Sequence, residues 1–285
     1  MFNIVNHRKI FFAISIIILL IGAVCFFVNG LNTDIDFTGG TAIYVDLGTA
    51  YDEAAVRDCV DAVEGVTVSS VQKTDDNGAL VKTTAIDTEL RTKVTDALKA
   101  KFENSTVMSV DNVSASVGQE LWSNAALSIC IAAILMLIYI TFRFEVLSGI
   151  SAVLALVHDM LMMIAIYAIF QFPVNTSFIA AILTILGYSI NATIVIFDRI
   201  RENTRFLKKE TFGDVVNKSV WQSMGRSINT SITTLLTIVM VYILGVPSIK
   251  DFALPLIIGI VAGTYSSIFI AGQFWVLFKG NKTVK

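Results

Sequence analysis

The stretch at residues 183–203, "LTILGYSINATIVIFDRIREN", begins as an apolar run and ends in a cluster of charges. Its apolar part extends back to residue 176, which makes it long enough to cross the hydrocarbon core of a bilayer as a helix. Asn191 stands in the middle of the run, where lipid offers a polar side chain no partner. We therefore expect a membrane-spanning helix whose polar side chain faces neighbouring helices.

Five further apolar runs of similar length occur in the chain, which has 285 residues and is 55% hydrophobic and only 15% charged. This composition is too apolar for an ordinary soluble domain. Together the runs predict six transmembrane helices, at 10–29, 122–142, 146–170, 176–197, 227–246 and 252–278. The first run resembles a signal peptide, but its apolar core is too long and no clear small-residue cleavage site is present, so we expect it to be retained as an anchor.

Charge is distributed unevenly along the chain. Residues 31–121 carry 7 Lys/Arg against 16 Asp/Glu, a net charge of −9, whereas the remainder carries 14 against 7, a net charge of +7. The positive-inside rule places the basic segments in the cytoplasm. We therefore predict three cytoplasmic segments: the N-terminus at 1–9, a loop at 198–226 and the C-terminus at 279–285.

The acidic segment at 30–121, between the first two spans, is predicted to be a folded domain outside the cytoplasm. Within 41–113, patterns typical of strands and amphipathic helices follow one another in the order βαββαβ. This order is that of a ferredoxin-like domain, a fold that by itself implies no function. The expected fold class is a polytopic α-helical membrane protein, with five spans in 122–278 and an extracytoplasmic α+β ferredoxin-like domain.

This domain contains no recognisable catalytic or metal-binding constellation. The segment "DFTGGT", 36–41, lacks the Lys-Ser/Thr ending of a phosphate-binding loop. We interpret its Asp36, Gly39 and Gly40 as a turn that acts as a hinge between span and domain. The three cysteines do not form a disulfide or metal-binding pattern. We therefore expect no cofactor, no metal and no enzymatic activity.

Ionisable residues in or beside the spans are costly to bury and usually functional. His158 and Asp159 lie near the middle of the third span, Asp198 ends the fourth and Arg226 precedes the fifth. The first two are either a hydrogen-bonded pair that fixes helix packing or groups that handle ions or protons. Asp198 and Arg226 are either charges at the membrane interface or members of an ion-coupling site.

Helical spacing places polar residues on one face of each of two neighbouring spans. These faces comprise Tyr188, Asn191, Val195 and Asp198 in the fourth span and Arg226, Asn229 and Thr233 in the fifth. We expect them to form a buried polar seam. In the sixth span, Gly259 and Gly263 are four residues apart, a spacing that lets helices approach closely.

Several stretches, in matching order and over nearly the whole chain, resemble the SecF family of protein-export membrane proteins. These stretches are "DIDFTGGT" after the first span, "SVGQEL" before the second, "TFRFE" after it, "HD" in the third, "AAILTILGYSINATIVIFDRIREN" in the fourth and "GRSINTSITT" in the fifth. The fourth-span stretch is the most specific. The arrangement of spans and outside domain also resembles half of a resistance-nodulation-division (RND) transporter.

The resemblance implies a function and a set of partners. SecF proteins pair with SecD and assist the SecYEG channel, with SecA on the cytoplasmic side, in pulling unfolded preproteins outward after the ATP-driven step. They are thought to use the proton motive force. The resemblance implies a bacterial cytoplasmic membrane as the location, with membrane lipid around the spans. The net charge of −9 on the outside domain argues against nucleic acid as a partner.

One position departs from the family pattern. SecF proteins typically have Asn-Asp in the fourth span, where the aspartate couples protons, but here Asn191 is followed by Ala192. The family's partner arginine matches Arg226. Three coupling schemes stay open: protons pass through another carboxylate, chiefly in SecD; sodium replaces protons near Asn191; or coupling is lost and the chain is a scaffold for SecD.

Two functions of other classes fit the sequence less well than protein export. An RND-like exporter of a small amphipathic molecule usually needs a larger outside domain than about 90 residues. An intramembrane aspartyl protease needs two carboxylates at similar depth, whereas Asp159 is in mid-span and Asp198 at a helix end.

Overall fold

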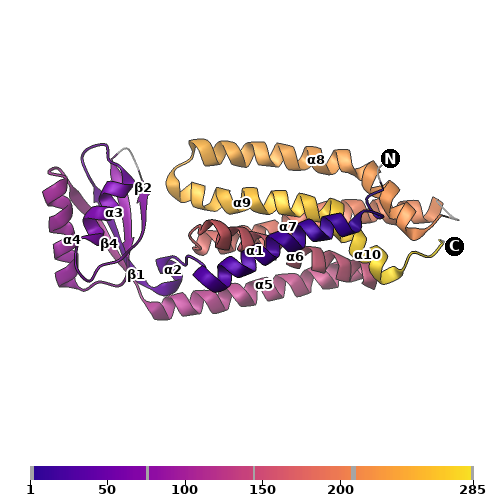
Figure 1. The fold of residues 1–285 in the computed structure, drawn as a ribbon, viewed down its shortest axis with the longest axis horizontal. Helices are drawn as coiled ribbons and strands as arrows, with labels where there is room; N and C mark the ends of the chain where they lie inside the picture. Colours follow the sequence, from indigo (N-terminus) through magenta and orange to yellow (C-terminus); the bar gives the residue numbers. More distant parts are fainter. Residues whose placement is uncertain (1–2, 75–76, 144, 207–209, 284–285) are drawn as a thin grey trace.

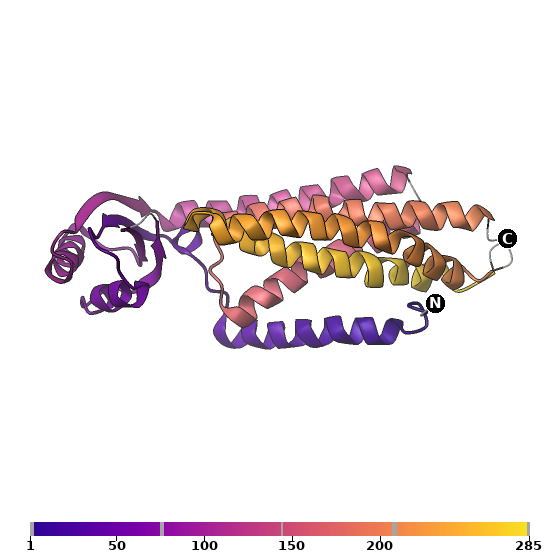
Figure 2. The same cartoon turned by 90° about the horizontal axis from the view of Figure 1, so that it is seen from above.

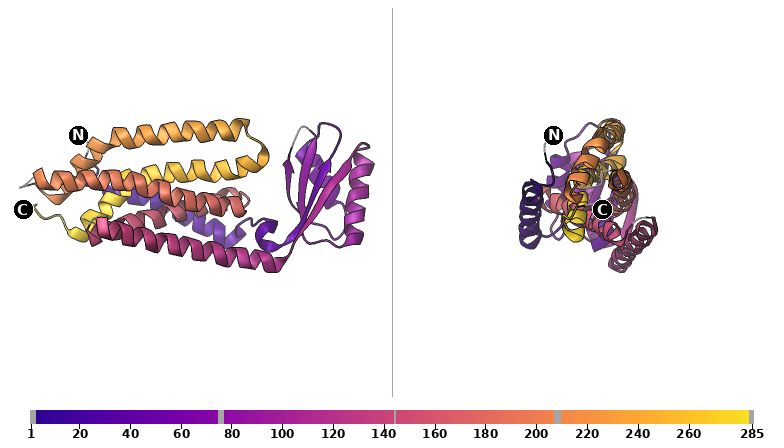
Figure 3. Two further views of the ribbon diagram at one scale, coloured as in Figure 1. Left: turned by 180° about the vertical axis from the view of Figure 1, so that it is seen from behind. Right: turned by 90° about the vertical axis from the view of Figure 1, so that its right-hand side faces the viewer.

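The computed structural model describes residues 3–74, 77–143, 145–206 and 210–283, in which a helical bundle carries a small sheet domain at one end (Figure 1). The three segments predicted to be cytoplasmic, 1–9, 198–226 and 279–285, each lie partly outside the described residues. Both chain ends lie at the end of the bundle away from the sheet (Figure 3). The molecule is therefore elongated along the helices.

Six helical segments in the described part are long and apolar enough to cross a membrane. Five of these segments are the single helices α1 (Arg8–Asn29), α5 (Ala115–Arg143), α6 (Val146–Phe170), α7 (Thr176–Phe206) and α8 (Phe212–Leu244). The sixth consists of α9 (Pro247–Ser266), a π-helical turn η1 (Ser267–Ala271) and α10 (Gly272–Lys279). The chain is thus a polytopic helical membrane protein.

The bundle has inner and outer helices. The most apolar windows of α6, α7 and the sixth segment are 39–61% buried, whereas those of α1, α5 and α8 are only 11% buried. Figure 2 shows α1 along one edge of the bundle. The outer three helices therefore expose apolar side chains to lipid or to a partner, and polar side chains are best sheltered along α6, α7 and α9.

Several helices extend beyond the predicted spans. The predicted loop at 198–226 is mostly helical, because α7 continues to Phe206 and α8 already begins at Phe212. Polar contacts hold these extensions together: Asn203 Nδ2 donates to Ser219 Oγ (2.8 Å), and Arg199 Nε donates to Gln222 Oε1 (2.6 Å). Apolar runs mark the part of a helix that lipid surrounds, so they underestimate its length where water or protein solvates the ends.

The sheet domain, residues 40–113, has the predicted order of elements. They are β1 (Gly40–Asp46), α3 (Glu53–Asp61), β2 (Val68–Lys73), β3 (Gly78–Thr83), α4 (Thr88–Lys101) and β4 (Thr106–Val113). The four strands pair antiparallel in the order β2-β3-β1-β4. Apolar residues on one face of the sheet, among them Ile43 and Val81, pack with Val56 and Leu98 of the helices into a separate core.

The connection from α1 to β1 is more structured than a tight turn. A short helix α2 (Ile35–Thr38) begins after Asp34, whose Oδ1 accepts from Ile35 N (2.7 Å). Gly39 then ends it with φ +76, a conformation that side chains other than glycine rarely adopt. Gly40 starts β1 opposite Val113. Whether this segment serves as a hinge stays a prediction.

Close helix contacts occur at the two glycines of α9, Gly259 and Gly263. A Cβ on Gly259 would lie 2.5 Å from Ile185 Cγ1 of α7, and one on Gly263 would lie 3.0 Å from Ser189 Cβ. By contrast, a Cβ on Gly187 of α7 would meet nothing within 4 Å. Glycine therefore lets α9 pack directly on α7.

The change Gly259→Ala should destabilise the bundle by about 1–3 kcal/mol, because an extra methyl must displace a branched side chain in a packed interface. The matched change Gly187→Ala has open space and should leave stability equal or higher by about 0.5–1 kcal/mol, since glycine is unfavourable inside a helix. Thermal unfolding midpoints in detergent compare the two. Equal midpoints for both variants would contradict the packing role of Gly259.

Candidate functional site: the domain junction and the polar groups between helices

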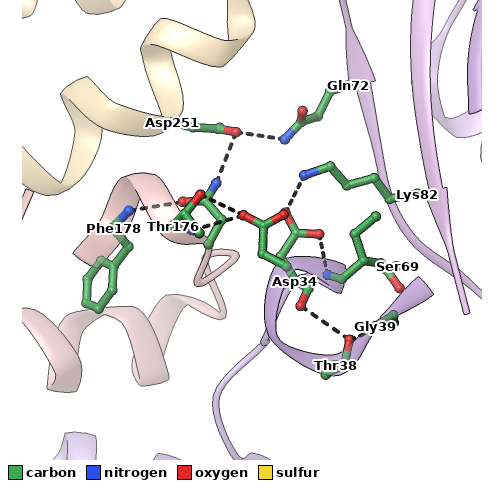
Figure 4. Close-up of polar contacts among 12 residues, drawn as sticks. Asp34, Thr38, Gly39, Ser69, Gln72, Lys82, Thr176, Phe178 and Asp251 are labelled. Atoms are coloured by element: carbon green, nitrogen blue, oxygen red, sulfur yellow. Dashed lines mark hydrogen bonds and ion pairs between the residues drawn. The ribbon is translucent and has the colours of Figure 1, made fainter. Parts of the chain in front are cut away.

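The sheet domain is fixed to the helices by a buried ion pair. Lys82 Nζ of β3 lies 2.5 Å from Asp34 Oδ2, and both residues are buried (Figure 4). The backbone N–H of Asp34 donates to Val174 O (2.9 Å), just before α7. A buried ion pair is stable only when its remaining polar atoms also have hydrogen-bond partners. The Asp34 carboxylate meets this condition, because its other oxygen accepts from Ile35 N.

Two further carboxylates complete this junction. Asp36 Oδ2 accepts from the backbone N (3.0 Å) and Oγ1 (2.8 Å) of Thr176, at the start of α7. Asp251 Oδ2 of α9 accepts from Gln72 Nε2 of β2 (2.8 Å) and from Asn175 Nδ2 (3.3 Å) (Figure 4). Strand β3 is therefore bonded to the residue before α2 and β2 to α9, and α2 and α9 are in turn bonded to the segment that begins α7. A cleft of about 960 Å³ lies beside this junction, between β2 and the α8–α9 connection.

A second polar cluster lies inside the bundle. His158 Nδ1 of α6 is 3.1 Å from Asp159 Oδ1, and His158 Nε2 is 2.9 Å from Ser15 Oγ of α1. On the other side, Ser189 Oγ of α7 donates to Asp159 Oδ2 (2.5 Å). All four side chains are buried. They form one chain of hydrogen bonds, Ser15–His158–Asp159–Ser189, that joins three helices.

Hydroxyl groups extend this cluster to the sixth segment. Ser267 Oγ donates to the backbone carbonyl of Ser189 (3.4 Å) and is 2.9 Å from Thr193 Oγ1. Ser267 is the first residue of the π-helical turn, a feature often found at functional positions in helices. The polar contacts of α7 with both α6 and η1 thus lie on its inner face.

The predicted seam is not fully buried, and only part of it lines a cavity of about 260 Å³ between α7 and α8. It is lined by Tyr188, Asn191, Ala192 and Val195 of α7 and by Arg226, Ser227, Thr230 and Ser231 of α8. Asn191 and Arg226 are exposed at its mouth, and among the described residues Arg226 has no ion-pair partner. The buried Ser227 Oγ also has no hydrogen-bond partner in the described part of the chain.

The ionisable residues singled out in the sequence do not all lie at one site in the structure. The carboxylate of Asp159 is bonded to His158 and Ser189, so it does not pair with Arg226. Ser189 and Asn191 lie on different faces of α7, so the buried cluster and the α7–α8 cavity are distinct sites. Asp198, Asn229 and Thr233 are exposed and do not line the cavity.

The described residues form no metal-binding group of side chains: no three His, Cys, Asp or Glu side chains in that part of the chain are grouped as metal ligands. In the sheet domain, burial raises the pKa of the Cys59 thiol above its usual value, which outweighs the opposing effect of Lys101. The protonated thiol, whose sulfur lies 3.4 Å from Ala97 O, is a poor nucleophile.

Sequence reasoning missed the partners that come from distant segments. Ser15, Lys82 and Asp251 carry no motif, and their contacts join residues 48 to 179 positions apart along the chain. A weak signal was present for Lys82, a charged residue in an otherwise apolar strand. The charges at Asp34 and Asp36 directly after the first span gave a similar hint.

Comparisons with known proteins agree with this architecture. The model of the family "Protein export membrane protein SecD/SecF, C-terminal" matches residues 93–281. The chain is 39% identical to protein translocase subunit SecF of Sebaldella termitidis, over 98% of this chain and 92% of that protein. It is 36% identical to SecF of Acidaminococcus fermentans, over 98% and 97%.

The chain belongs to the SecD/SecF family of protein export membrane proteins. Two further members of the family are longer than this chain, which matches only part of their length. Protein translocase subunit SecDF of Bacillus subtilis is 36% identical over 98% of this chain, which covers 38% of that protein. The crystal structure of SecDF from Thermus thermophilus, described as a translocon-associated membrane protein, has a TM-score of 0.84 at 32% identity, and the chain covers 38% of its length. In these two family members, one polypeptide contains a counterpart of this chain and a longer remainder.

The change Lys82→Met should destabilise the junction by about 3–5 kcal/mol, because it leaves the buried Asp34 carboxylate without its charge partner. Adding Asp34→Asn should recover much of this loss, since the amide oxygen can still accept from Ile35 N. Trp122, whose ring centroid is 4.5 Å from that of Phe37 in α2, reports on the junction when Trp221 and Trp275 are replaced by Phe. Thermal unfolding followed by its fluorescence gives the comparison.

The control for this prediction is Lys93→Met, which removes an exposed lysine of α4 paired with Glu89. It should leave the Trp122 transition unchanged because exposed pairs contribute little. If Lys93→Met and Lys82→Met shifted the transition equally, the Lys82–Asp34 pair would not be what holds the domain.

Proposed function

We propose that this chain is the SecF subunit of the Sec translocase and assists protein export together with SecD. The observation that carries the proposal is its 39% identity to a protein translocase subunit SecF over 98% of the chain. The SecDF relatives, in which a counterpart of this chain is part of a longer polypeptide, support SecD as a separate partner here. The translocon-associated title of one of them supports SecYEG, with SecA and unfolded preproteins, as the setting.

We further propose that the sheet domain is an extracytoplasmic ferredoxin-like domain. The antiparallel order β2-β3-β1-β4 with two helices on one face is the arrangement expected for the βαββαβ unit. The orientation follows from charge: the termini and the α7–α8 connection, where basic residues gather, lie at the end opposite the sheet domain (Figure 1). Both termini are then cytoplasmic, in a bacterial cytoplasmic membrane.

The α7–α8 cavity is the part of the membrane region that we assign to SecD. Arg226 lies at its mouth without an in-chain ion pair among the described residues, and Ser227 Oγ lacks a partner there. An arginine within reach of the membrane needs a counter-charge, and Ala192 cannot supply one. A SecD carboxylate that enters this cavity would satisfy Arg226 and also complete the site that the family forms with its fourth-span aspartate.

The energy source that we propose is the proton gradient, and the chain itself is not an enzyme. In this proposal, work on a preprotein comes from an ion gradient that shifts the helices and the attached sheet domain. A small-molecule exporter is the alternative, and it predicts a different phenotype on depletion: sensitivity to drugs or detergents instead of accumulated precursors.

Export into inverted vesicles that contain this chain, SecD, SecYEG and SecA tests the proposal. Once the ATP-driven step has been stopped, the amount of preprotein that completes its passage into the vesicle lumen should fall several-fold when the proton gradient is collapsed and the sodium gradient is held. A fall only with the sodium gradient would move coupling to oxygen ligands such as Asn191. No fall with either gradient would leave the chain as a scaffold for SecD.

The change Arg226→Gln should weaken the binding of SecD by about 2–5 kcal/mol, because a buried carboxylate of SecD would lose its charge partner. The double change Arg226→Gln, Ala192→Asp should bind more weakly still, since two carboxylates would then face each other. Arg91→Gln, in α4 of the sheet domain, is the control and should bind normally. Affinity of the purified chain for SecD in nanodiscs is the measurement, and normal binding by Arg226→Gln would exclude this interface.

A further inference from the structure

A pocket of about 410 Å³ lies at the end of the bundle away from the sheet domain, where α10 ends (Figure 1). It shares no lining residue with the α7–α8 cavity or with the cleft beside the domain junction. Helices α5, α7 and α10 and the α5–α6 connection form its walls. Its lining includes Phe142, Glu145, Arg201, Arg205, Trp275 and Lys279.

The lining of this pocket has a net positive charge. Arg201, Arg205 and Lys279 are cationic, and Glu145 is the one carboxylate among the lining residues. Glu145 Oε2 is 2.7 Å from Lys279 Nζ. Arg201 and Arg205 are four residues apart on α7, so they lie on the same face of the helix. Arg205 is exposed and forms no ion pair with a described residue. One carboxylate cannot neutralise three cations, so the pocket attracts anions.

Trp275 gives the pocket a packed wall and a hydrogen-bond donor without an acceptor. The residue is 3% exposed, and its ring centroid lies 4.8 Å from that of Phe197 and 5.5 Å from that of Phe212. The Nζ of Lys279 lies over the indole, 5.6 Å from its centroid. The buried Nε1 has no hydrogen-bond partner among the described residues. Leaving a buried donor unsatisfied is costly, and an oxygen of a ligand in the pocket would be an acceptor for it.

The pocket lies at the depth of lipid headgroups. The predicted spans in α5, α7 and the sixth segment end at residues 142, 197 and 278. Phe142 and Lys279 therefore stand at the edge of the hydrocarbon core. At 1.5 Å per residue, Arg201 lies about 6 Å and Arg205 about 12 Å beyond that edge along α7. The headgroup region on each side of a bilayer is about 5–8 Å thick, and an arginine side chain is long enough to reach back into it.

Exposed apolar rings beside the cations favour a lipid over a soluble anion. Phe142, which lines the pocket, is 89% exposed, and Phe206, next to Arg205 at the end of α7, is 75% exposed. A soluble anion would leave both rings in water, which is unfavourable for apolar surface. A phospholipid brings acyl chains to the same place as its phosphate group.

We propose that this pocket binds the headgroup of one anionic phospholipid, with Arg201, Arg205 and Lys279 around the phosphate and Phe142 beside the acyl chains. Basic pockets between transmembrane helices at a membrane surface are known sites for anionic headgroups. The bound headgroup connects α7 with α10 and with the α5–α6 connection, and it thereby stabilises this end of the bundle. The site goes beyond the proposed function, because it requires neither SecD nor an ion gradient, and the orientation of the chain decides only which leaflet supplies the lipid.

The first test measures lipid binding to the purified full chain in a neutral detergent by native mass spectrometry. The probes are phosphatidylglycerol and phosphatidylcholine with identical acyl chains. Phosphatidylglycerol should bind about tenfold more tightly, because its phosphate charge is not neutralised by a choline group. Equal affinities for the two lipids would overturn the proposal.

Charge-removing variants locate the binding site. Arg205→Gln should weaken phosphatidylglycerol binding about fivefold, the effect of one cation near an anionic lipid, and adding Lys279→Gln should bring the loss to about 25-fold. Arg205 is exposed and unpaired in the described residues, so its replacement should leave the fold intact. Lys218→Gln is the matched control, because it removes the same charge from α8 at the same end of the bundle, where Lys218 is paired with Glu210 and does not line the pocket. Equal losses in Lys218→Gln and Arg205→Gln would overturn the proposal, since overall charge alone would then explain binding.

Competition with inorganic phosphate distinguishes a lipid headgroup from a soluble anion. Phosphate in large excess should displace little of the bound phosphatidylglycerol, because it makes no contact with Phe142. Displacement at equal concentrations would overturn the lipid assignment.

Thermal unfolding in nanodiscs tests the stabilising effect of the headgroup. The midpoint should be several degrees higher in phosphatidylglycerol than in phosphatidylcholine for the wild-type chain and for Lys218→Gln, because a ligand that binds the folded state stabilises it. The difference should disappear in the double variant Arg205→Gln, Lys279→Gln, and a difference that persists there would contradict the proposal. None of these samples contains SecD or the channel, so failure of the lipid site and failure of the proposed function are separate results.

Discussion

Lipid cannot hydrogen-bond to polar groups, and this constraint explains where the ionisable residues of the predicted spans lie. Large apolar side chains are exposed along the outer helices α1, α5 and α8, while the ionisable pair of the third span lies where α6 contacts α1 and α7. Hydroxyl groups of serine provide its hydrogen-bond partners. Arg226 has no ion-pair partner and Ser227 Oγ no hydrogen-bond partner among the described residues, so they mark one surface at which the fold of this chain alone does not meet the constraint.

Helix α7 therefore borders two different environments. Its inner face, with Ser189 and Thr193, is satisfied within the chain, and its other face, with Asn191 and Ala192, borders the cavity with Arg226. Ala192 brings no charge to the face that borders the cavity. The buried carboxylate of Asp159 lies on a separate set of contacts, so neither face depends on the charge of the other.

The sequence was sufficient for those features that depend on local patterns. The six spans follow from apolar runs, and the strand and helix order of the sheet domain follows from alternation and amphipathicity. It was insufficient where water or protein replaces lipid around a helix: Phe206 and Phe212, at the ends of α7 and α8, lie inside what was predicted to be a loop.

The sequence also could not pair Lys82 with Asp34, or His158 with Ser15, because these contacts depend on how distant segments pack. Asn191 and Arg226 were correctly associated, since their facing spans are neighbours along the chain.

The attachment of the sheet domain has a mechanical consequence. Its two covalent connections enter at one point, because Gly40 pairs with Val113, and a Cβ on Gly118 of α5 would lie 2.3 Å from Phe37 O of α2. Strands β1 and β4 thus form the attached edge of the sheet, and β2 lies at the opposite edge, about 10 Å from β1 and about 14 Å from β4. The contact of Gln72 with Asp251 holds β2 beside the cleft. A rotation about the attached edge would displace β2 more than β3, so the Gln72–Asp251 hydrogen bond resists it over a longer arm than the Lys82–Asp34 pair does.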